Sequence, residues 1–349
     1  VWEVLEAFAS FGFCKAHAAA FALPTYQSAW MKTHHTAAFL AGVLTHDPGM
    51  YPKRLILEDA RAFGIAVLSL DVNLSDDVYR VEKIGVDDEP PPGILGEPPR
   101  HPPPDGLPDA RAYGLRLSLA DVSGISTDEV ERIMAGRPYR SLTDFWYRAR
   151  VSRPIAEKLV MAGALDSIYG LGSTVPVPRR GRTTRRDLLL ALADLDGVRV
   201  RRRGGRRQAA AAPEQLTLAL ESDETSTGSG LAEMTTTERV QAELEILGLD
   251  ASRHVVDFYA DFLTAFGTTR SVDMLRQRST AELWVAGVKV ATQTPPVRSG
   301  RRVIFLTLDD GSGPVDATFF EDAQGPYAST LFDSWLLLVR GELRRTGPR

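Results

Sequence analysis

Apolar residues recur with helical spacing through the first 70 residues of the chain. The runs AAFLAGVLTH (Ala37–His46) and LILEDARAFG (Leu55–Gly64) place aliphatic side chains three and four positions apart, as in an amphipathic helix. Gly64 stands where a glycine commonly ends a helix. The next run, IAVLSLDVN (Ile65–Asn73), is rich in β-branched residues and predicts a short strand.

A further helix is predicted over Lys15–His34. Pro24 should kink it after Ala20, because proline removes a backbone hydrogen bond. At about 100° per residue, four polar or aromatic side chains fall on one stripe of this helix: His17, Phe21, Ser28 and Lys32. The opposite side, which includes Tyr26, is expected to pack in a core.

The middle of the chain divides by composition. Residues 90–108 hold nine prolines in nineteen positions and are expected to form a loop or insertion rather than a helix or central strand. Residues 109–170 are again helical in pattern. Residues 171–235 are basic and then rich in small polar residues, which predicts a mobile linker. Helical spacing returns in 236–280, most clearly over Glu238–Asp250.

The last region, residues 281–349, changes to strand-like patterning. It contains four runs rich in β-branched and aromatic residues: LWVAGVKVA (Leu283–Ala291), RRVIFLTLDD (Arg301–Asp310), GPVDATFFE (Gly313–Glu321) and SWLLLVRGEL (Ser334–Leu343). Glycine- and proline-containing turns separate them. They predict a small antiparallel barrel of the oligonucleotide-binding (OB) kind. Such barrels have five strands, so we expect this barrel to be incomplete.

Composition limits the class of protein. The chain has 349 residues, of which 44% are hydrophobic and 25% charged, as in soluble globular proteins of two or three domains. The sequence has neither an apolar stretch of membrane-spanning length nor a signal-like start. Cys14 is the single cysteine, which fits the reducing cytoplasm. Because the chain starts at Val1 rather than at a methionine, we expect a fragment or an incomplete gene product.

The segment DVSGISTDEVERIM (Asp121–Met134) predicts two helices joined by a tight glycine hairpin, the pattern of a helix-hairpin-helix. In that motif, hairpin amides and the following helix N-terminus bind a DNA phosphate without contacting bases. The candidate DNA-binding residues are Gly124, Ile125, Ser126 and Arg132. Ser126 replaces the usual second hairpin glycine, and the alternative is a plain helical hairpin in a core. Charge reversal at Arg132 should weaken duplex binding if the phosphate interpretation is right.

The predicted barrel supplies a second set of candidates. OB-folds bind single strands by stacking bases on aromatic side chains and by placing basic groups near phosphates. Suitable residues here are Trp284, Lys289, Arg298, Arg301 and Arg302. By strand alternation, Phe305, Phe319 and Phe320 are expected to lie at least partly in the core.

The formal charge of −4 argues against a uniformly basic nucleic-acid binder, but charge is unevenly distributed. Between residues 179 and 207 there are eleven arginines and three aspartates, a net +8 that would suit either phosphate contact or a solvated linker. Within the same linker, EQLTLAL (Glu214–Leu220) could hold a sliding clamp through Gln215, Leu216 and Leu218. A chance amphipathic turn is the alternative for this peptide.

Other chemistry finds little support in the sequence. His34, His35 and His46 lack the spacing of a metal-ligand motif. Cys14 lies near Lys15 and His17, but nothing supplies a third group to orient a thiolate, so a packed small residue is expected.

The stretch GFCKAHAAAFALPTYQSAWMKTHH (Gly12–His35) resembles the fingers-domain signature of the bacterial C-family DNA polymerases, the family of the replicative alpha subunit. Further segments follow in the family's order: residues 37–73, the helix-hairpin-helix, SRPIAEKLVMAGALDSIYG (Ser152–Gly170) and the barrel. The last two resemble the error-prone, damage-tolerant branch more than the replicative one. The resemblance covers nearly the whole chain except the proline segment and the basic linker.

The resemblance implies a multidomain fold. Residues 1–89 would be the C-terminal part of mainly α-helical fingers, residues 109–170 a helix-hairpin-helix region, and residues 281–349 an OB-fold. It also implies template-directed nucleotide addition by a nucleotidyltransferase that uses two Mg²⁺ ions. The palm carboxylates that hold these ions are expected upstream of this chain, so the chain alone is predicted to be inactive.

The resemblance also implies roles for individual residues. Lys15, His17 and Phe21, with Lys32 on the same stripe, would lie near the incoming nucleotide. Phe21 replaces a tyrosine found in many members, which puts any hydroxyl-dependent role in doubt. The implied partners are primer-template DNA, a dNTP, the sliding clamp and accessory translesion proteins. The alternatives are a non-catalytic DNA-binding module or a fragment of the replicative alpha subunit.

Overall fold

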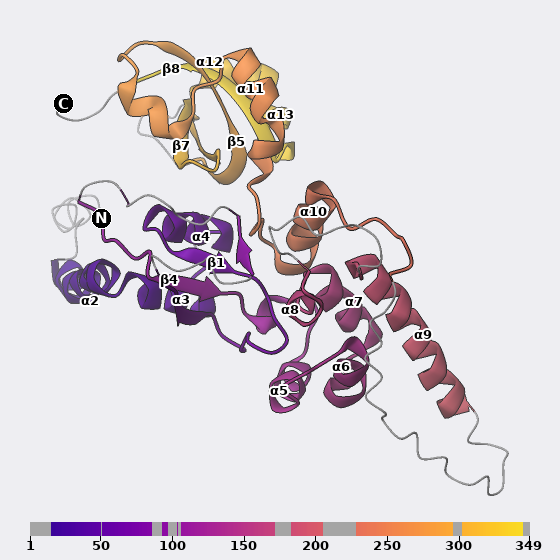
Figure 1. Ribbon diagram of the computed structural model, residues 1–349. Coiled ribbons are helices and arrows are strands. Elements are labelled where there is room, and N and C mark those ends of the chain that lie inside the picture. The colour runs from indigo at the N-terminus through magenta and orange to yellow at the C-terminus, as the bar shows by residue number, and fades with distance from the viewer. Residues whose placement is uncertain are drawn as a thin grey trace, which may run out of the picture.

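The computed structural model describes residues 15–49, 51–85, 93–96, 103, 106–171, 183–204, 228–295 and 302–344 (Figure 1). A helical and mixed-sheet body forms the first part, and a small β-domain formed by the C-terminal part of the chain lies beside it. In this described part of the chain, no helix is both long and apolar enough to cross a membrane.

The predicted N-terminal helices are present as α2 (Lys15–His34), α3 (Thr36–His46) and α4 (Lys53–Ala62). Helix α2 passes through Pro24 without ending there. None of its residues is buried, and Tyr26 is 69% exposed. Among the described residues, the prediction that Tyr26 packs in a core is therefore wrong. Helical spacing shows which residues share a face of the helix, but not whether another element packs against that face.

A four-stranded mixed sheet follows these helices. Its strands are β1 (Ala66–Leu68), β2 (Arg80–Lys83), β3 (Ile94–Leu95) and β4 (Tyr113–Arg116), in the order β2-β4-β1-β3. Strand β1 pairs in parallel with β4, and the other pairs are antiparallel. The strand predicted after Gly64 is confirmed by β1, which is buried along its length. Strands β2, β3 and β4 were not predicted. Strand β3 lies inside the proline-rich segment, where two residues without proline pair at the sheet edge.

The helix-hairpin-helix region packs beside this sheet. It contains a single 3₁₀ turn, η1 (Leu119–Asp121), and four helices: α5 (Thr127–Ala135), α6 (Leu142–Ala149), α7 (Arg153–Met161) and α8 (Asp166–Tyr169). Val130 and Ile133 of α5 are buried, as their spacing predicts. Phe145 and Trp146 of α6 are among the largest fully buried side chains.

Two later helices complete the body. The region predicted as a linker instead contains α9 (Arg185–Gly204), and Leu188 and Leu192 of this helix are buried in the common core. The high arginine content of this segment led to the linker prediction, although its apolar residues have helical spacing. Helix α10 (Thr236–Leu247) confirms the helix predicted there, with a Thr235–Glu238 capping box at its start. One hydrophobic core runs from α3 through the sheet to α10.

The C-terminal domain starts with η3 (Val255–Tyr259), α11 (Ala260–Phe266) and η4 (Ser271–Arg276). The four predicted strands are confirmed as β5 (Glu282–Gln293), β6 (Ile304–Asp309), β7 (Pro314–Phe319) and β8 (Leu336–Glu342). They form an antiparallel sheet in the order β7-β6-β5-β8, with an irregularity between Lys289 and Ala291. Three short helices lie between β7 and β8: α12 (Glu321–Gln324), η5 (Gly325–Tyr327) and α13 (Ala328–Asp333). This domain has its own small core.

Polar groups join the two parts. The Arg54 guanidinium on α4 donates to the Lys289 carbonyl at 3.4 Å and lies 5.8 Å from the centre of the Trp335 ring. His254, in the connection before η3, has its Nε2 3.3 Å from the Asp309 carboxylate. Burial lowers the pKa of His254, but the neighbouring carboxylates of Asp309 and Asp250 outweigh it, so the pKa lies above its ordinary value.

Candidate nucleic-acid interface

The first hairpin, Val122–Ser126, joins η1 to α5. Its turn is closed by the Ile125 amide, which donates to the Val122 carbonyl at 3.0 Å. Gly124 has a φ of +82°, a conformation that residues other than glycine rarely adopt. Gly124 and Ser126 are exposed and Ile125 is partly buried. The hairpin predicted from the sequence is thus present, with its glycine at the surface.

The Glu129 carboxylate accepts a hydrogen bond from a backbone N–H group of this hairpin. Its carboxylate accepts from the Ser126 amide at 3.1 Å and from the Ser152 amide at 2.8 Å, which links the starts of α5 and α7. Burial alone would raise the pKa of Glu129, but the hydrogen bonds from these N–H groups have the larger effect, so the pKa lies below its ordinary value. The Ser126 amide, predicted to contact phosphate, is therefore engaged in a capping box within the protein.

A lysine from another helix reaches the first hairpin. The Lys158 ammonium, on α7, donates to the Ser123 carbonyl, and a Cβ added at Gly124 would lie 3.6 Å from it. Arg132, the predicted cation, remains exposed, but its Nε donates to the Ala149 carbonyl at the end of α6. Sequence reasoning missed Lys158 because it lies 34 positions after Gly124 in the chain.

The second hairpin, Met161–Leu165, joins α7 to α8. Gly163 has a φ of +81°, and the Ala164 amide donates to the Leu159 carbonyl at 2.8 Å. Arg185, from the start of α9, covers this hairpin: it donates to the Met161 carbonyl at 2.8 Å and pairs with Asp166 at 2.6 Å. Both members of this ion pair are largely buried. The second hairpin is thus closed by the protein itself.

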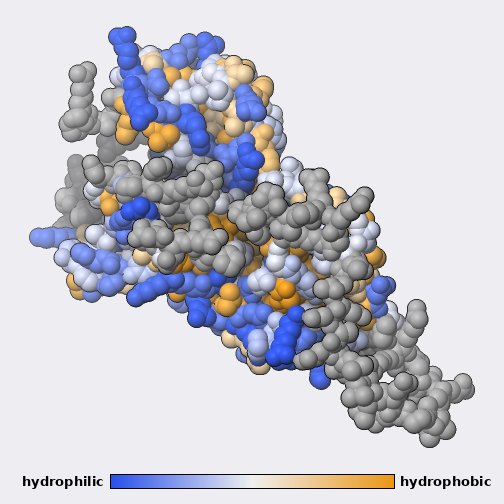
Figure 2. Space-filling model, in the orientation of Figure 1, coloured by the Kyte–Doolittle hydropathy of each residue, from blue (hydrophilic) through white to orange (hydrophobic). Residues whose placement is uncertain are grey.

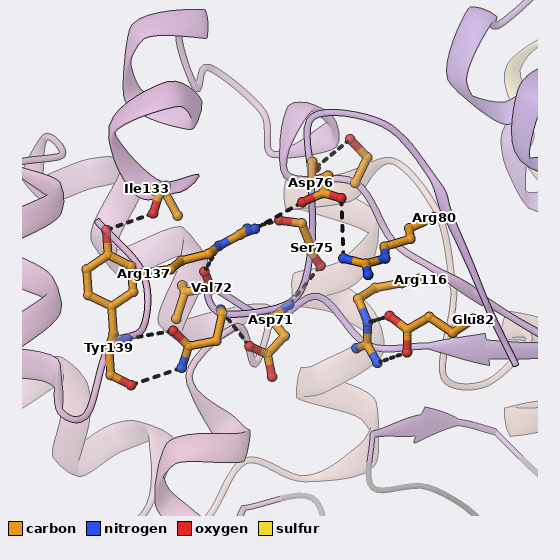
Figure 3. Close-up of polar contacts among 12 residues, drawn as sticks. Asp71, Val72, Ser75, Asp76, Arg80, Glu82, Arg116, Ile133, Arg137 and Tyr139 are labelled. Atoms are coloured by element: carbon orange, nitrogen blue, oxygen red, sulfur yellow. Dashed lines mark hydrogen bonds and ion pairs between the residues drawn. The ribbon is translucent and has the colours of Figure 1, made fainter. Parts of the chain in front are cut away.

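A polar network fastens the segment after β1 to the loop before α6 (Figure 3). Arg137 donates from Nε to the Val72 carbonyl at 2.8 Å and from Nη1 to Asp76 at 3.0 Å. Asn73 exchanges hydrogen bonds with the backbone of Tyr139 at 2.7 and 2.9 Å. These contacts hold the sheet against the helix-hairpin-helix region.

A second set of polar contacts fixes the start of the first hairpin. Asp121, at the end of η1, accepts from the Lys53 ammonium of α4 at 2.6 Å and from the Tyr79 hydroxyl. Burial, together with the adjacent Asp121 carboxylate, raises the pKa of Tyr79 far above its ordinary value. Tyr79 therefore stays a protonated donor to Asp121, and α4 and the hairpin are held in one arrangement.

The β-domain exposes aromatic side chains at places that alternation did not predict. Phe305 on β6 is 40% exposed, Phe320 is exposed, and Phe319 packs partly on the core. The core prediction is therefore correct for Phe319 and wrong for Phe305 and Phe320. Figure 2 shows hydrophobic groups interspersed with hydrophilic ones over the visible face of this domain. Beside Phe305, the outward face carries Thr307, which donates to Asp316 at 2.7 Å.

The predicted barrel cations and tryptophan have internal contacts. Lys289 donates to the carbonyls of Leu331 and Phe332 at 3.0 and 2.8 Å, so it caps the end of α13. Trp284 lies edge-on to Phe266 at 5.0 Å between ring centres, with the Arg340 guanidinium 5.8 Å away. Arg302 is exposed. Arg298 and Arg301 lie outside the described residues.

The predicted nucleotide stripe on α2 is only partly assembled. Lys15, His17 and Phe21 are exposed, and the rings of His17 and Phe21 lie 4.6 Å apart. Lys32 instead pairs with Asp59 of α4 at 2.6 Å. The structure therefore brings His17 and Phe21 together, leaves Lys15 exposed at the start of the helix and directs Lys32 towards α4.

The candidate clamp residues Gln215, Leu216 and Leu218 lie outside the described residues. Among the residues that are described, no group of three His, Cys, Asp or Glu side chains could hold a metal ion. The described residues therefore do not fit the Mg²⁺ ions that the resemblance implies.

Comparison with known families matches the two halves of this interface. Residues 64–172 match the helix-hairpin-helix motif family, and residues 283–349 match the OB-fold nucleic acid binding domain family. The first match includes both hairpins, and the second covers all four strands of the β-domain.

Similarity to individual proteins extends along almost the whole chain. The error-prone DNA polymerase of Symbiobacterium thermophilum is 30% identical over 347 residues, which cover 95% of this chain. The DNA polymerase III subunit alpha of Vibrio cholerae is 28% identical over 98% of it, and the error-prone DNA polymerase of Pseudomonas fluorescens is 31% identical over 99%. This chain is a homologue of proteins named error-prone DNA polymerase and DNA polymerase III subunit alpha.

The polymerase homologue spans only part of its relatives. It covers 30%, 27% and 30% of the lengths of those three proteins, respectively. The family resemblance, the helix-hairpin-helix and the OB-fold expected from the sequence are confirmed. Relatives with both names occur at similar identity, so these matches do not separate the error-prone branch from the replicative one.

Proposed function

We propose that this chain is the nucleic-acid-holding and nucleotide-holding part of an error-prone DNA-directed DNA polymerase that acts in translesion synthesis and DNA repair. The observation that carries the proposal is the alignment of 95% of the chain with an error-prone polymerase, through both nucleic-acid-binding domains. The corresponding part of a replicative alpha subunit is the alternative, supported by the similarity to the Vibrio cholerae protein.

In this proposal the two domains bind different parts of the DNA. The first hairpin binds the sugar-phosphate backbone of the primer-template duplex, where contacts position the protein without discriminating between sequences. The OB-fold binds the single-stranded template, and Phe305 offers a ring for base stacking. Exposed Arg302 lies near the start of the same strand and supplies positive charge.

DNA binding is tested with the 349-residue chain by fluorescence anisotropy on duplex and single-stranded oligonucleotides. Phe305→Ala should weaken single-strand binding by about 1–3 kcal/mol, the contribution of one stacked base. Phe332→Ala removes another exposed phenylalanine, on α13, and serves as the matched control. Equal losses in the two variants would contradict a stacking role for Phe305.

The exposed face of α2 is proposed to contact the incoming dNTP. Lys15 would attract the phosphates, His17 would donate to phosphate or sugar, and Phe21 would pack on the sugar or base. In a full-length polymerase containing this chain, Lys15→Ala and His17→Ala should raise the nucleotide KM or lower kcat. Wild-type kinetics in both variants would refute this assignment.

The chemistry of nucleotide addition is proposed to reside elsewhere in the polymerase. The carboxylates that would hold two Mg²⁺ ions for this reaction are proposed to lie in another part of the polymerase. The 349-residue chain should therefore bind DNA in a salt-sensitive manner and fail to extend a primer. Primer extension by the chain alone would overturn this proposal while leaving the DNA-binding one intact.

Two further proposals concern context. Gln215, Leu216 and Leu218 would dock on a sliding clamp. A pull-down with purified clamp tests this by comparing the wild-type chain with a Gln215→Ala, Leu218→Ala double variant. Synthesis past a template lesion by the full-length polymerase would distinguish the error-prone branch from the replicative one. Clamp binding, synthesis past lesions and any contact with accessory translesion proteins are proposed to take place in the cytoplasm, where bacterial DNA lies.

A further inference from the structure

We propose that Lys158 is the phosphate-binding cation of the first hairpin, so that DNA contact by one hairpin depends on a helix that belongs to the other. The inference rests on the proposed DNA binding of the helix-hairpin-helix region. It assigns the electrostatic part of that contact to a residue outside the sequence segment that carries the motif.

The position of Lys158 on α7 directs it to the hairpin. Ile155, Ala156, Leu159 and Val160 of this helix are buried in the core, which fixes the helix and leaves the partly buried Lys158 between them to reach outwards. Its ammonium donates to the Ser123 carbonyl. A lysine has three N–H donors, so the remaining ones can meet phosphate oxygens.

Gly124 leaves room for such a contact. A Cβ at this position would lie 3.6 Å from the ammonium, so the absence of a side chain keeps the space beside Lys158 open. The hydrogen bond to Ser123 also restricts the flexible lysine side chain before DNA arrives. Such preorganisation lowers the entropy lost when the contact forms.

Two acidic groups next to the hairpin, Glu129 and Asp121, have other partners. Glu129 accepts from the amides of Ser126 and Ser152, and Asp121 pairs with Lys53. The described contact of the Lys158 ammonium is with a carbonyl oxygen rather than with a carboxylate. Its charge is therefore available to a phosphate, whereas the helix N-terminus of α5 is already capped.

The test compares two charge-neutralising variants of the 349-residue chain, Lys158→Gln and Arg132→Gln. Duplex affinity is measured by fluorescence anisotropy between about 50 and 200 mM salt, because one lost phosphate contact lowers the slope of log K against log salt by about 0.9. We expect this loss, with several-fold weaker binding, for Lys158→Gln. Arg132→Gln should keep the wild-type slope, since its guanidinium contacts α6.

A third variant separates charge from folding. Lys158→Arg keeps the cation and should keep the salt slope, while the thermal midpoint of each variant reports whether the hairpin remains folded. A wild-type slope in Lys158→Gln, or an equal fall in Arg132→Gln, would overturn the inference. If the wild-type chain itself binds DNA without salt dependence, the proposed hairpin function fails instead.

Discussion

The two glycine hairpins of the helix-hairpin-helix region share a backbone conformation but differ in what covers them. Gly124 and Gly163 have φ values of +82° and +81°. Exposed Gly124 adjoins a lysine ammonium, whereas Gly163 lies under the buried Arg185–Asp166 pair. The same local turn is therefore exposed to solvent in one hairpin and packed against the protein core in the other.

The difference arises from residues far away in the chain. Arg185 belongs to α9, in a region whose arginines and small residues predict a linker, and it approaches Gly163 from 22 positions further along. Its donor groups occupy the Met161 carbonyl of the second hairpin. A matching motif is therefore insufficient to identify a DNA contact without knowledge of what packs on it.

The largest effect should follow from uncovering the second hairpin. Arg185→Ala would leave Asp166 buried without its cation, at a cost of about 3–5 kcal/mol in the free energy of unfolding. The adjacent Arg186→Ala is the control, because its pair with Glu238 is more exposed and contributes about 1 kcal/mol or less. Urea unfolding monitored by circular dichroism compares them. Similar losses of unfolding free energy in both variants would contradict the conclusion that the Arg185–Asp166 pair closes the second hairpin.

Alanine at each glycine sharpens the contrast. Both substitutions force an unfavourable positive φ, at a cost of about 1–2 kcal/mol. At Gly163 the new Cβ would also lie 2.3 Å from the Arg185 guanidinium, which adds about 1–3 kcal/mol of overpacking. Gly163→Ala should therefore be the less stable variant in urea unfolding, whereas Gly124→Ala should lose more duplex affinity. The reverse ranking in either assay would break the comparison.

A smaller effect should come from the cap beside the first hairpin. Ser126→Ala removes the side-chain acceptor for the Glu129 amide and should cost about 1 kcal/mol in unfolding free energy. Ser123→Ala is the matched control, because this exposed serine contacts Lys158 and α10 through its backbone. Equal stability of Ser126→Ala and Ser123→Ala would show that the capping box does not stabilise the hairpin.

The smallest effect is a pH dependence of opposite sign at the two hairpins. The pKa of Glu129 lies below its ordinary value of about 4.5, so its stabilising contribution is present above that value and lost as pH falls through the lower folded pKa. Burial raises the pKa of Asp166 above its ordinary value of about 3.8 despite Arg185. Its contribution is therefore present below that value and lost as pH rises through the folded pKa.

Unfolding of Glu129→Gln and Asp166→Asn from about pH 3 to about pH 7 tests these signs. Relative to the wild type, the deficit of Glu129→Gln should grow as pH rises, and the deficit of Asp166→Asn should shrink. Parallel pH profiles for the two variants would mean that the hairpins do not differ in the electrostatics of their carboxylates.

Much of the local structure was predictable from the sequence. Alternation of β-branched and aromatic residues located all four strands of the β-domain, and the spacing of Val130 and Ile133 located the buried face of α5. Strands β2, β3 and β4 escaped prediction because runs of two to four residues are too short to show a period. Helix α9 escaped because arginine-rich composition outweighed the spacing of Leu188 and Leu192.

The candidate site was less predictable. Phe305 was assigned to the core, although the pleat of β6 turns it outwards, and Lys289 was assigned to DNA, although it caps α13. Lys32 shares a helical stripe with His17 and Phe21 but pairs with Asp59 of the next helix. For Lys289 and Lys32 a contact with another element decided the position of the side chain, whereas for Phe305 the pleat of its own strand decided it.

The sequence by itself determined the positions of most helices and strands, the glycine turn at Gly124 and the relationship to the polymerases. Backbone preferences, capping residues and apolar periodicity act over a few neighbouring residues, so they can be predicted without the fold. Only the tertiary structure decided that Arg185 covers Gly163, that Lys158 reaches the first hairpin and that Phe305 faces solvent. These contacts join elements tens of residues apart, and their geometry depends on the packing of the whole core.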